Sequence, residues 1–300
     1  MTAPTPNQFH FVFGLERQNQ PLHLLHYLAL ESCRLVNRPD RIFFHYKYEP
    51  FGEYWDRIKE HLELARVEPP SRVTQFRYSD PFIATFRYAH ESDFVRLDVL
   101  IEHGGVYADM DTLFVNPIPR PLFDHPFVLG AEEDVPCRAT GTTQPSLCNA
   151  LIMCQPGAEF ARLWRREMDT AFDGSWSRHS TLLPHDLATR HPDLIHVEPA
   201  RTFYKYMWTR KDLRRLFEEC EPADPAVASI HLWAHLWWSE TRRDFSNFHA
   251  GLITEDRIRG IDTTFYRLAR PFLPPERKGA RTLSRLMARL KRRPARFRIW

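Results

Sequence analysis

Two aspartates separated by one residue, Asp109 and Asp111, are the side chains whose type and spacing best suit chemistry. They belong to the run VYADMDTLFV, in which apolar residues alternate with polar ones. In a continuous strand over Val106–Val115, both carboxylates share one face, with Cα atoms about 7 Å apart. Buried neighbouring carboxylates repel each other and lose hydration, and a bound divalent cation relieves both effects. The spacing therefore indicates a Mg²⁺ or Mn²⁺ site that also takes phosphate oxygens, although a solvated strand end carries the same pattern.

A helix and a glycine turn lead into this strand. Ser92 is a good N-cap and the glycine pair at 104–105 ends a helix cheaply, so the sequence predicts a helix over Ser92–His103. Asp93 and Arg96 are three residues apart and fall on one face of that helix, where they can act together. The helix and the strand therefore each carry a pair of charged side chains.

Short apolar runs alternate with helix-like segments in the first half of the chain. Strands are predicted at Phe9–Leu15, Arg41–Lys47, Val73–Tyr78, Val106–Val115, Phe127–Ala131 and Asn149–Cys154. Helices are predicted at Pro21–Val36, Phe51–Arg66, Ser92–His103 and Ala158–Phe172. This alternation is typical of an α/β fold with a largely parallel sheet flanked by helices, and the less regular second half indicates a helical, loop-rich C-terminal part. In such sheets, ligands bind beyond the carboxyl ends of strands.

The run SDFVRLDVLIEHGGVYADMD resembles the signature of the family-32 glycosyltransferases and their relatives, including the clostridial glucosylating toxins and α-galactosyl- and mannosyltransferases. The shared pattern of Ser-Asp-x-x-Arg, an apolar helix, Gly-Gly-x-Tyr and Asp-x-Asp is matched here at Ser92, Asp93, Arg96, Gly104, Gly105, Tyr107, Asp109 and Asp111. Weaker similarity covers about residues 8–240, in the runs NQFHFVFG, CNALIMCQPG and SIHLWAHLWW. Phe13 stands where Trp is usual in the family, and STLLPHDLA replaces a Gly-Pro step, a departure that concerns the acceptor side.

The resemblance implies a retaining, metal-dependent transferase on a GT-A-like fold, a Rossmann-type mixed sheet flanked by helices. It implies that Asp111 binds the metal and through it the donor diphosphate. Asp109 is implied to contact the ribose or the donor sugar and to orient the metal shell, and His231 to meet metal or phosphate. The implied catalytic pair is therefore Asp109 and Asp111, with Mn²⁺ or Mg²⁺ as the cofactor.

The same resemblance implies how the nucleotide-sugar is held. Asp93, Arg96 and Asn149 would contact donor-sugar hydroxyls, Arg96 through its fixed fork of N–H donors. The residues implied to shape the nucleotide pocket or to shield the diphosphate are Phe13, Tyr107, Trp233 and Trp237. The sequence leaves the donor open between UDP- and GDP-sugars, and the acceptor open between a saccharide and a glycolipid.

The chemistry agrees with this resemblance and leaves two alternatives. A departing nucleoside diphosphate carries negative charge that a divalent cation stabilises, and with no strong nucleophile apparent, same-face attack by an acceptor hydroxyl is favoured. The run DMDTL also fits the Asp-x-Asp-x-Thr pattern of haloacid-dehalogenase-type phosphatases, but it begins far from the N-terminus and no later Gly-Asp-x-x-x-Asp follows. A catalytically inactive sugar-nucleotide-binding protein is the other alternative, which the intact set of charged residues opposes.

Histidines outside these motifs are weaker candidates. His23 and His26 lie three residues apart on a predicted helix, a spacing that suits a metal but that ordinary packing explains more simply. His179 and two further histidines lie near Asp186 in a loop-rich stretch. Asp186 is thus a candidate for activating an acceptor there.

The charge of the chain is concentrated at one end. The net charge is +3, yet residues 275–300 hold ten Lys/Arg and one acidic residue, so residues 1–274 are net acidic. We expect a transferase domain over 1–274 and a basic tail over 275–300. Apolar residues of the tail fall opposite its arginines, the pattern of an amphipathic helix on an anionic membrane surface or of a helix packed on the body. Nucleic acid is not an expected partner.

Cysteine usage and hydropathy bear on location. The five cysteines are odd in number, widely spaced and without zinc-site spacing, which indicates free thiols in a reducing cytoplasm. The first residues do not form a signal peptide, and no run reaches the roughly 18–20 apolar residues of a membrane span. We therefore expect a cytoplasmic enzyme of cell-surface glycan synthesis, with the tail as a means of peripheral attachment to the inner face of the membrane.

Overall fold

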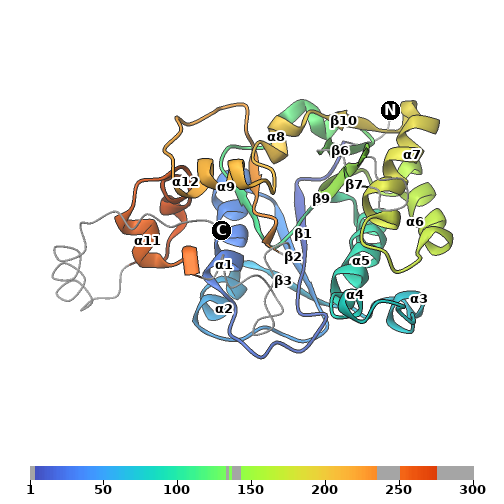
Figure 1. Cartoon of the computed structure of the whole chain (residues 1–300), viewed down its shortest axis with the longest axis horizontal. Helices are drawn as coiled ribbons and strands as arrows, with labels where there is room; N and C mark the ends of the chain where they lie inside the picture. Colours follow the sequence, from blue (N-terminus) through green and yellow to red (C-terminus); the bar gives the residue numbers. More distant parts are fainter. Residues whose placement is uncertain (1–3, 133–134, 137–142, 235–250, 276–300) are drawn as a thin grey trace.

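A computed structural model describes residues 4–132, 135–136, 143–234 and 251–275 of the chain. Its centre is a seven-stranded sheet in the order β10-β6-β9-β4-β1-β2-β3 (Figure 1). The strands are β1 Gln8–Val12, β2 Arg41–Tyr46, β3 Glu63–Arg66, β4 Gly105–Ala108, β6 Phe127–Ala131, β9 Leu147–Cys154 and β10 His196–Glu198. Strand β9 runs antiparallel to both of its neighbours, β4 and β6, and the other pairings in this sheet are parallel.

Two small sheets are added to the central one. Strand β5, Thr112–Phe114, pairs antiparallel with β11, Ser229–His231, and places Thr112 opposite His231. Strands β7, Val135–Pro136, and β8, Thr143–Gln144, form a second antiparallel pair. The first of these sheets joins a segment late in the chain to the residues that directly follow β4.

Helices cover both faces of the central sheet. The described α-helices are α1 Leu24–Ser32, α2 Glu53–Ile58, α3 Ser71–Thr74, α4 Pro81–Ala84, α5 Arg87–His103, α6 Glu159–Ala171, α7 Leu183–Arg190, α8 Ala200–Tyr204, α9 Arg210–Phe217, α11 Glu255–Gly260 and α12 Thr264–Ala269. Two π-helical turns, η1 Cys33–Asn37 and η4 Arg178–Leu182, adjoin α1 and α7. Figure 1 shows α5, α6 and α7 on one side of the sheet and α1, α9 and α12 on the other.

Two apolar clusters fill the spaces between these layers, because successive strand residues point to opposite faces. Val106 and Ala108 of β4 join the cluster that contains α1, α8 and α9, whereas Tyr107 joins the cluster that contains α5, α6 and α7. The predicted α/β architecture, a mixed sheet flanked by helices with a helical, loop-rich C-terminal part, is confirmed. Among the residues described, no helix combines the length and the apolar content that crossing a membrane requires.

Gly104 and Gly105 make the tight connection from α5 to β4. Their φ angles are 65° and 106°, in the left-handed region that favours glycine. A Cβ on Gly105 would lie 2.5 Å from the backbone oxygen of Gln8, since β4 pairs directly with β1. The predicted glycine stop therefore also delivers the chain into the middle of the sheet.

Several sequence predictions of elements are wrong, for local reasons. Val73–Tyr78 is not a strand, because α3 begins directly after Pro70 and ends within that range. The predicted helix over Phe51–Arg66 ends at α2 and η2 (Lys59–His61), and its last residues form β3. Strand β3 lies at the sheet edge with mostly exposed side chains, so it shows no alternating pattern. Helix α5 starts five residues before Ser92, which lies inside the helix instead of capping it.

Candidate functional site

Asp109 and Asp111 lie in a turn at the carboxyl end of β4. The predicted single strand over Val106–Val115 is wrong, because the chain leaves the central sheet after Ala108 and joins a second, two-stranded sheet at β5. The N–H of Asp109 still donates to the Ala150 oxygen of β9 at 2.8 Å, and the N–H of Thr112 donates to the Asp109 oxygen at 3.0 Å. The two carboxylates therefore converge through a turn and not through a shared strand face.

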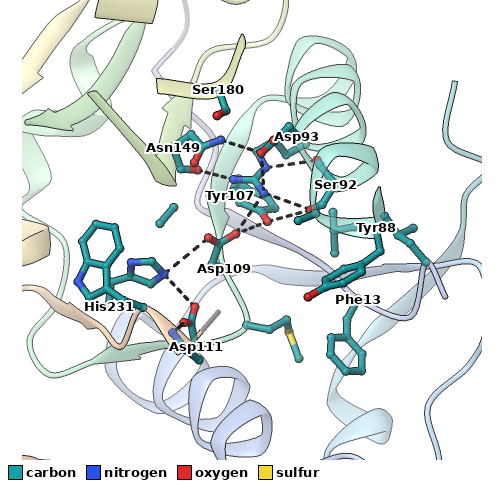
Figure 2. Close-up of a pocket in the computed structure, with 18 of the residues that line it drawn as sticks. Phe13, Tyr88, Ser92, Asp93, Tyr107, Asp109, Asp111, Asn149, Ser180 and His231 are labelled. Carbon is teal, nitrogen blue, oxygen red and sulfur yellow. Dashed lines mark hydrogen bonds and ion pairs between the residues drawn. The ribbon is translucent and has the colours of Figure 1, made fainter. Parts of the chain in front are cut away.

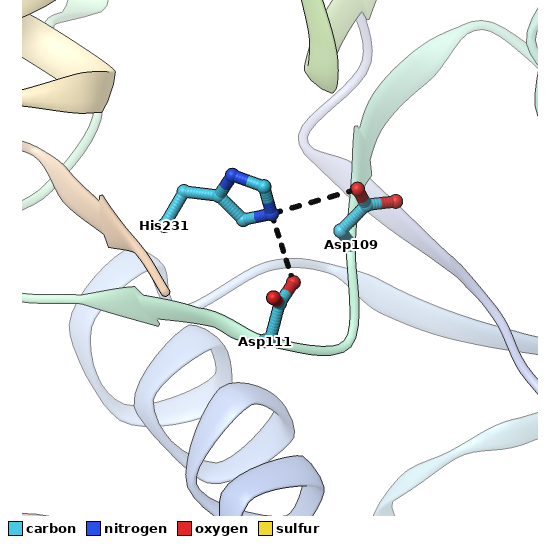
Figure 3. Close-up of side chains that lie close together, drawn as sticks. All are labelled: Asp109, Asp111 and His231. Atoms are coloured by element: carbon cyan, nitrogen blue, oxygen red, sulfur yellow. Dashed lines mark ion pairs between the residues drawn. The ribbon is translucent and has the colours of Figure 1, made fainter. Parts of the chain in front are cut away.

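His231 completes a cluster with the two aspartates (Figure 3). One carboxylate oxygen of each aspartate and one imidazole nitrogen all lie within 4.8 Å of one another. His231 Nε2 is 2.9 Å from Asp111 Oδ1 and 3.7 Å from Asp109 Oδ2. The backbone that follows β11 holds Asp111 in place, because the N–H of Ala234 donates to Asp111 Oδ2 at 2.8 Å.

This cluster has the donor set of a divalent cation site. His231 is buried, and neither of its ring nitrogens has a partner in hydrogen-bond geometry among the described residues, despite the close approach of Nε2 to Asp111. A buried imidazole that lies this close to carboxylate oxygens is suited to sharing an ion with them. Oxygen and nitrogen ligands of this kind suit Mn²⁺ and Mg²⁺.

Burial and charge shift the pKa values of these groups. Burial raises the pKa of Asp109 above its usual range, although the neighbouring Arg96 acts to lower it. Burial lowers the pKa of His231, but Asp111, Asp109 and Glu132 together outweigh burial and leave this pKa raised. A proton on Asp109 or His231 would therefore compete with any cation bound between them.

Arg96 links the cluster to α5 through Asp109 and Asp93. Figure 2 shows these two aspartates on the same side of the cavity as Tyr107. The Arg96 guanidinium is 3.1 Å from Asp93 Oδ1 and 3.4 Å from Asp109 Oδ1, and it donates to the Asn149 backbone oxygen at 2.8 Å. It also lies over the Tyr107 ring, 4.4 Å from the centroid, while the Tyr107 hydroxyl donates to Asp109 Oδ1 at 2.6 Å. Helix α5 and strands β4 and β9 are thus all linked by the buried guanidinium of Arg96.

Asp93 is held by three partners. Its Oδ1 accepts from Asn149 Nδ2 at 2.8 Å as well as facing Arg96, and its Oδ2 lies 2.9 Å from His179 Nε2. Burial raises the pKa of Asp93, but Arg96, His179 and His90 together outweigh burial and leave this pKa lowered. Asp93 is therefore a charged carboxylate with a fixed orientation.

His179 is a site residue that the sequence only placed in a loop-rich stretch. It belongs to the π-helical turn η4, a feature that occurs often at functional sites, and its side chain is fully buried. Asp186, the predicted acceptor-activating residue, has a side chain that is 66% exposed and does not line the cavity described next. His23 caps α1, and the His26 Nδ1 contacts the Met110 oxygen at 3.1 Å, which agrees with the packing explanation for both.

The two groups of charged residues line one cavity of about 810 Å³. The predicted site residues on its wall are Phe13, Asp93, Arg96, Tyr107, Asp109, Asp111, Asn149, His231 and Trp233. Trp237 lies outside the described residues. The volume is within the range of sites for nucleotides and drug-sized ligands.

Further lining residues were not predicted as site residues, although Ser180 and Thr181 begin the run STLLPHDLA noted in the sequence. Glu132 follows β6, and burial raises its pKa. Tyr88, Trp176, Ser177, Ser180 and Thr181 form an aromatic and hydroxyl-bearing wall. These residues come from segments outside the recognised motif, so only the fold brings them together.

Comparison with known proteins agrees with the motif. Residues 29–134 match the family described as "Glycosyltransferase sugar-binding region containing DXD motif", which confirms the resemblance to DXD-containing glycosyltransferases. Over 276 aligned residues the chain is 29% identical to glucan organizing enzyme 1 of Cryptococcus neoformans var. grubii. The alignment covers 90% of this chain and 71% of that protein. The phosphatase alternative for DMDTL is not favoured.

Two solved glycosyltransferases are similar in structure at low sequence identity. The glycosyltransferase GlyE of Streptococcus pneumoniae TIGR4 is 12% identical, with 95% of this chain and 63% of that chain covered and a TM-score of 0.45. The galactosyltransferase LgtC, solved with donor and acceptor sugar analogs, is 15% identical, with 91% and 99% covered and a TM-score of 0.42.

Proposed function

Because residues 29–134 match the DXD-containing sugar-binding region of glycosyltransferases, we propose that this protein is a metal-dependent, retaining glycosyltransferase. It moves a hexosyl unit from a UDP- or GDP-sugar to a saccharide or glycolipid acceptor. One observation carries the proposal: the ligand atoms of Asp109, Asp111 and His231 converge within 4.8 Å on the wall of a cavity that is large enough for a nucleotide-sugar.

The residues divide into two functional groups. Asp109, Asp111 and His231 would hold Mn²⁺ or Mg²⁺ and, through it, the donor diphosphate. When bound, the cation supplies Lewis-acid stabilisation of the charge on the departing diphosphate. Asp93 and Arg96 fix each other at 3.1 Å and face the same cavity, where they would orient donor-sugar hydroxyls.

Phe13, Tyr107 and Trp233 are aromatic residues that line the same cavity, where they would enclose the nucleotide and its diphosphate. Trp233 is fixed by a hydrogen bond from its Nε1 to the Tyr206 oxygen at 3.1 Å. Its φ of 52° places it in the left-handed region, where a residue of this size is uncommon. The backbone thus holds the indole beside His231, with ring centroids 4.3 Å apart.

The proposed reaction keeps the anomeric configuration. The bond between the sugar C1 and the diphosphate oxygen breaks, and an acceptor hydroxyl oxygen bonds to C1 on the same face. The hydroxyl proton passes to an oxygen of the leaving phosphate. Arg96, buried among Asp93, Asp109 and Tyr107, keeps the charged wall in one arrangement during this step.

The test uses a panel of UDP- and GDP-sugars with Mn²⁺. For each donor, we measure the rise in the thermal midpoint of the protein and the rate of slow hydrolysis to sugar and nucleoside diphosphate. One preferred donor and a product of retained configuration by NMR support the proposal. A product of inverted configuration contradicts the retaining mechanism. Donor binding with no turnover in the presence of saccharide acceptors supports a catalytically inactive binding protein instead.

We further propose that the enzyme works in the cytoplasm in cell-surface glycan synthesis, attached to an anionic membrane by residues 275–300. The support is the basic, amphipathic pattern of that tail, which lies outside the described residues apart from Pro275. A variant that ends at Pro274 should lose co-sedimentation with anionic vesicles and keep donor hydrolysis. Undiminished sedimentation of the shortened chain contradicts the role of the tail.

A further inference from the structure

One wall of the cavity has a chemistry different from that of the charged groups. Tyr88 comes from the start of α5, and Trp176, Ser177, Ser180 and Thr181 come from η4 and the residues before it. Figure 2 shows Ser180 beyond Asn149 and Asp93, on the side away from Asp111, whereas the Tyr88 ring lies near Phe13. The cavity therefore extends from a candidate cation site to a wall of aromatic rings and hydroxyl groups.

Aromatic side chains continue from this wall to the protein surface. The rings of Trp176 and Phe86 pack edge to face, 5.6 Å apart at an interplanar angle of 82°. Phe86 and Phe82 pack in the same way, 5.2 Å apart at 71°. Phe86 is buried, whereas Phe82 is 66% exposed, more than any other large apolar side chain among the described residues. Trp176, on the cavity wall, and Phe82, at the surface, are thus the two ends of a row of three rings whose middle member is buried.

The local structure fixes Phe82 at the surface. Asp80 caps α4, with its Oδ1 accepting from the N–H of Phe82 at 2.8 Å, and Pro81 occupies the first turn. The Thr85 hydroxyl donates to the Phe82 oxygen at 2.6 Å. The ring of Phe86, four residues later in the chain, packs against the Phe82 ring on the protein side. An exposed phenylalanine on a capped turn is a rigid contact surface that loses little entropy when it binds.

Rings flanked by hydroxyl groups suit carbohydrate. A pyranose presents C–H groups on its faces, which pack on aromatic rings, and hydroxyls on its rim, which hydrogen-bond to Ser and Thr. A lipid chain would instead require a continuous apolar surface, and here polar Asp80 and Thr85 adjoin Phe82. Because Phe86 is buried between them, the two rings offer separate contacts, Trp176 on the cavity wall and Phe82 at the surface. Such a pair suits a ligand that extends out of the cavity.

We propose that Trp176 and Phe82 form subsites for successive sugar units of a linear oligosaccharide acceptor. This inference rests on the proposed function, because it assigns the acceptor side of the same cavity. Trp176, on the cavity wall, contacts a unit close to the reacting hydroxyl. Phe82 contacts a unit further along the acceptor, outside the cavity.

The test measures how affinity depends on acceptor length. The full chain, with UDP or GDP and Mn²⁺, is titrated by calorimetry with linear gluco- and manno-oligosaccharides of α and β linkage, from two to six units. We expect at least one hexasaccharide to bind about tenfold more tightly than its disaccharide. Phe82→Ala should reduce this ratio to about one, and Phe82→Tyr should restore it, since tyrosine keeps the ring.

Phe51→Ala is the matched control, because Phe51 is also an exposed phenylalanine, 47% accessible, and does not line the cavity. The control should keep the length ratio of the wild type. The subsites are refuted if no oligosaccharide gains affinity with length, or if folded Phe82→Ala keeps the full ratio. Nucleotide-sugar binding is measured on the same samples. If no nucleotide-sugar binds, the proposed function is refuted. If affinity still increases with oligosaccharide length in that case, the two subsites are supported independently of the proposed function.

Discussion

At the scale of single residues, the orientation of Asp93 depends on His179, a side chain 86 positions away in the sequence. Arg96 and Asn149 both act on Oδ1, whereas His179 Nε2 is the partner of Oδ2. A buried carboxylate that loses one such partner is free to turn away from the cavity. His179 is therefore a positioning residue for the proposed donor site.

We expect His179→Ala to lower kcat/KM for donor hydrolysis by roughly tenfold to a hundredfold, the effect of one hydrogen bond to a charged group. His179→Gln should recover part of the loss, because its amide can donate to Asp93. Steady-state kinetics on variants of matched thermal midpoint make the measurement. Unchanged kcat/KM in a folded His179→Ala protein contradicts the positioning role.

The site residues could be predicted where they lie along one segment. Asp93, Arg96, Asp109 and Asp111 belong to a single helix–turn–strand unit, so the motif in the sequence already grouped them. His231 was named only through the resemblance, since pairing of β11 with β5 brings it there. His179, Glu132 and Trp176 could not be predicted, because their proximity depends on tertiary packing that leaves no local pattern.

At the scale of elements, the step from α5 to β4 positions both charged groups. Gly105 has a φ of 106°, and a Cβ at this position would lie 2.5 Å from the Gln8 backbone oxygen. The left-handed conformation and the contact with the backbone both oppose any larger residue. The glycine pair therefore sets the register of β4 against β1.

Gly105→Ala should destabilise the fold by about 3 kcal/mol, since it adds conformational strain and a backbone clash. Gly260→Ala is the matched control, because a Cβ there meets nothing within 4 Å and the change should stay within about 0.5 kcal/mol. Urea denaturation of both variants gives the two free energies of unfolding. Equal stability of the two variants contradicts this account of the turn.

Elements with a buried face were predicted well, and those at the margin were not. Strand β6 was predicted with its observed bounds, and α6 to within one residue at each end, because each has a strong apolar face. Strand β3, at the exposed sheet edge, and α3, a single turn after Pro70, bury too little to leave a periodic pattern. The split of Val106–Val115 was missed because alternation does not reveal where a strand changes sheets.

At the scale of the whole molecule, a stack of histidines joins the sheet to the end of α5. His10 Nδ1 lies 3.0 Å from His45 Nε2, and His10 Nε2 lies 2.9 Å from the Gly104 oxygen. Burial, reinforced by His45, lowers the pKa of His10 to about 3, and burial lowers the pKa of His45 to about 4. Both imidazoles are therefore neutral in the folded protein over most of the acid range.

Stability should fall as the pH drops from about 6.5 towards 4, because unfolded histidines take up protons that the folded ones refuse. At pH 5, each histidine should lower the free energy of unfolding by about 2 kcal/mol, and above pH 7 neither should change it. Urea denaturation across this range gives the slope, and His10→Gln should reduce it. A slope unchanged by His10→Gln contradicts the assignment.

The central claim is that Asp109, Asp111 and His231 hold a divalent cation in the cavity. Calorimetric titration of Mn²⁺ into the protein with a nucleoside diphosphate tests it most directly, with Asp111→Asn as the variant and Asp98→Asn as the control. Asp98 is also an aspartate of this region, but it pairs with Arg165 and does not line the cavity. The account predicts one Mn²⁺ bound by the wild type and by Asp98→Asn, and affinity lower by roughly a hundredfold in Asp111→Asn. Equal Mn²⁺ affinity of the wild type and folded Asp111→Asn would contradict it.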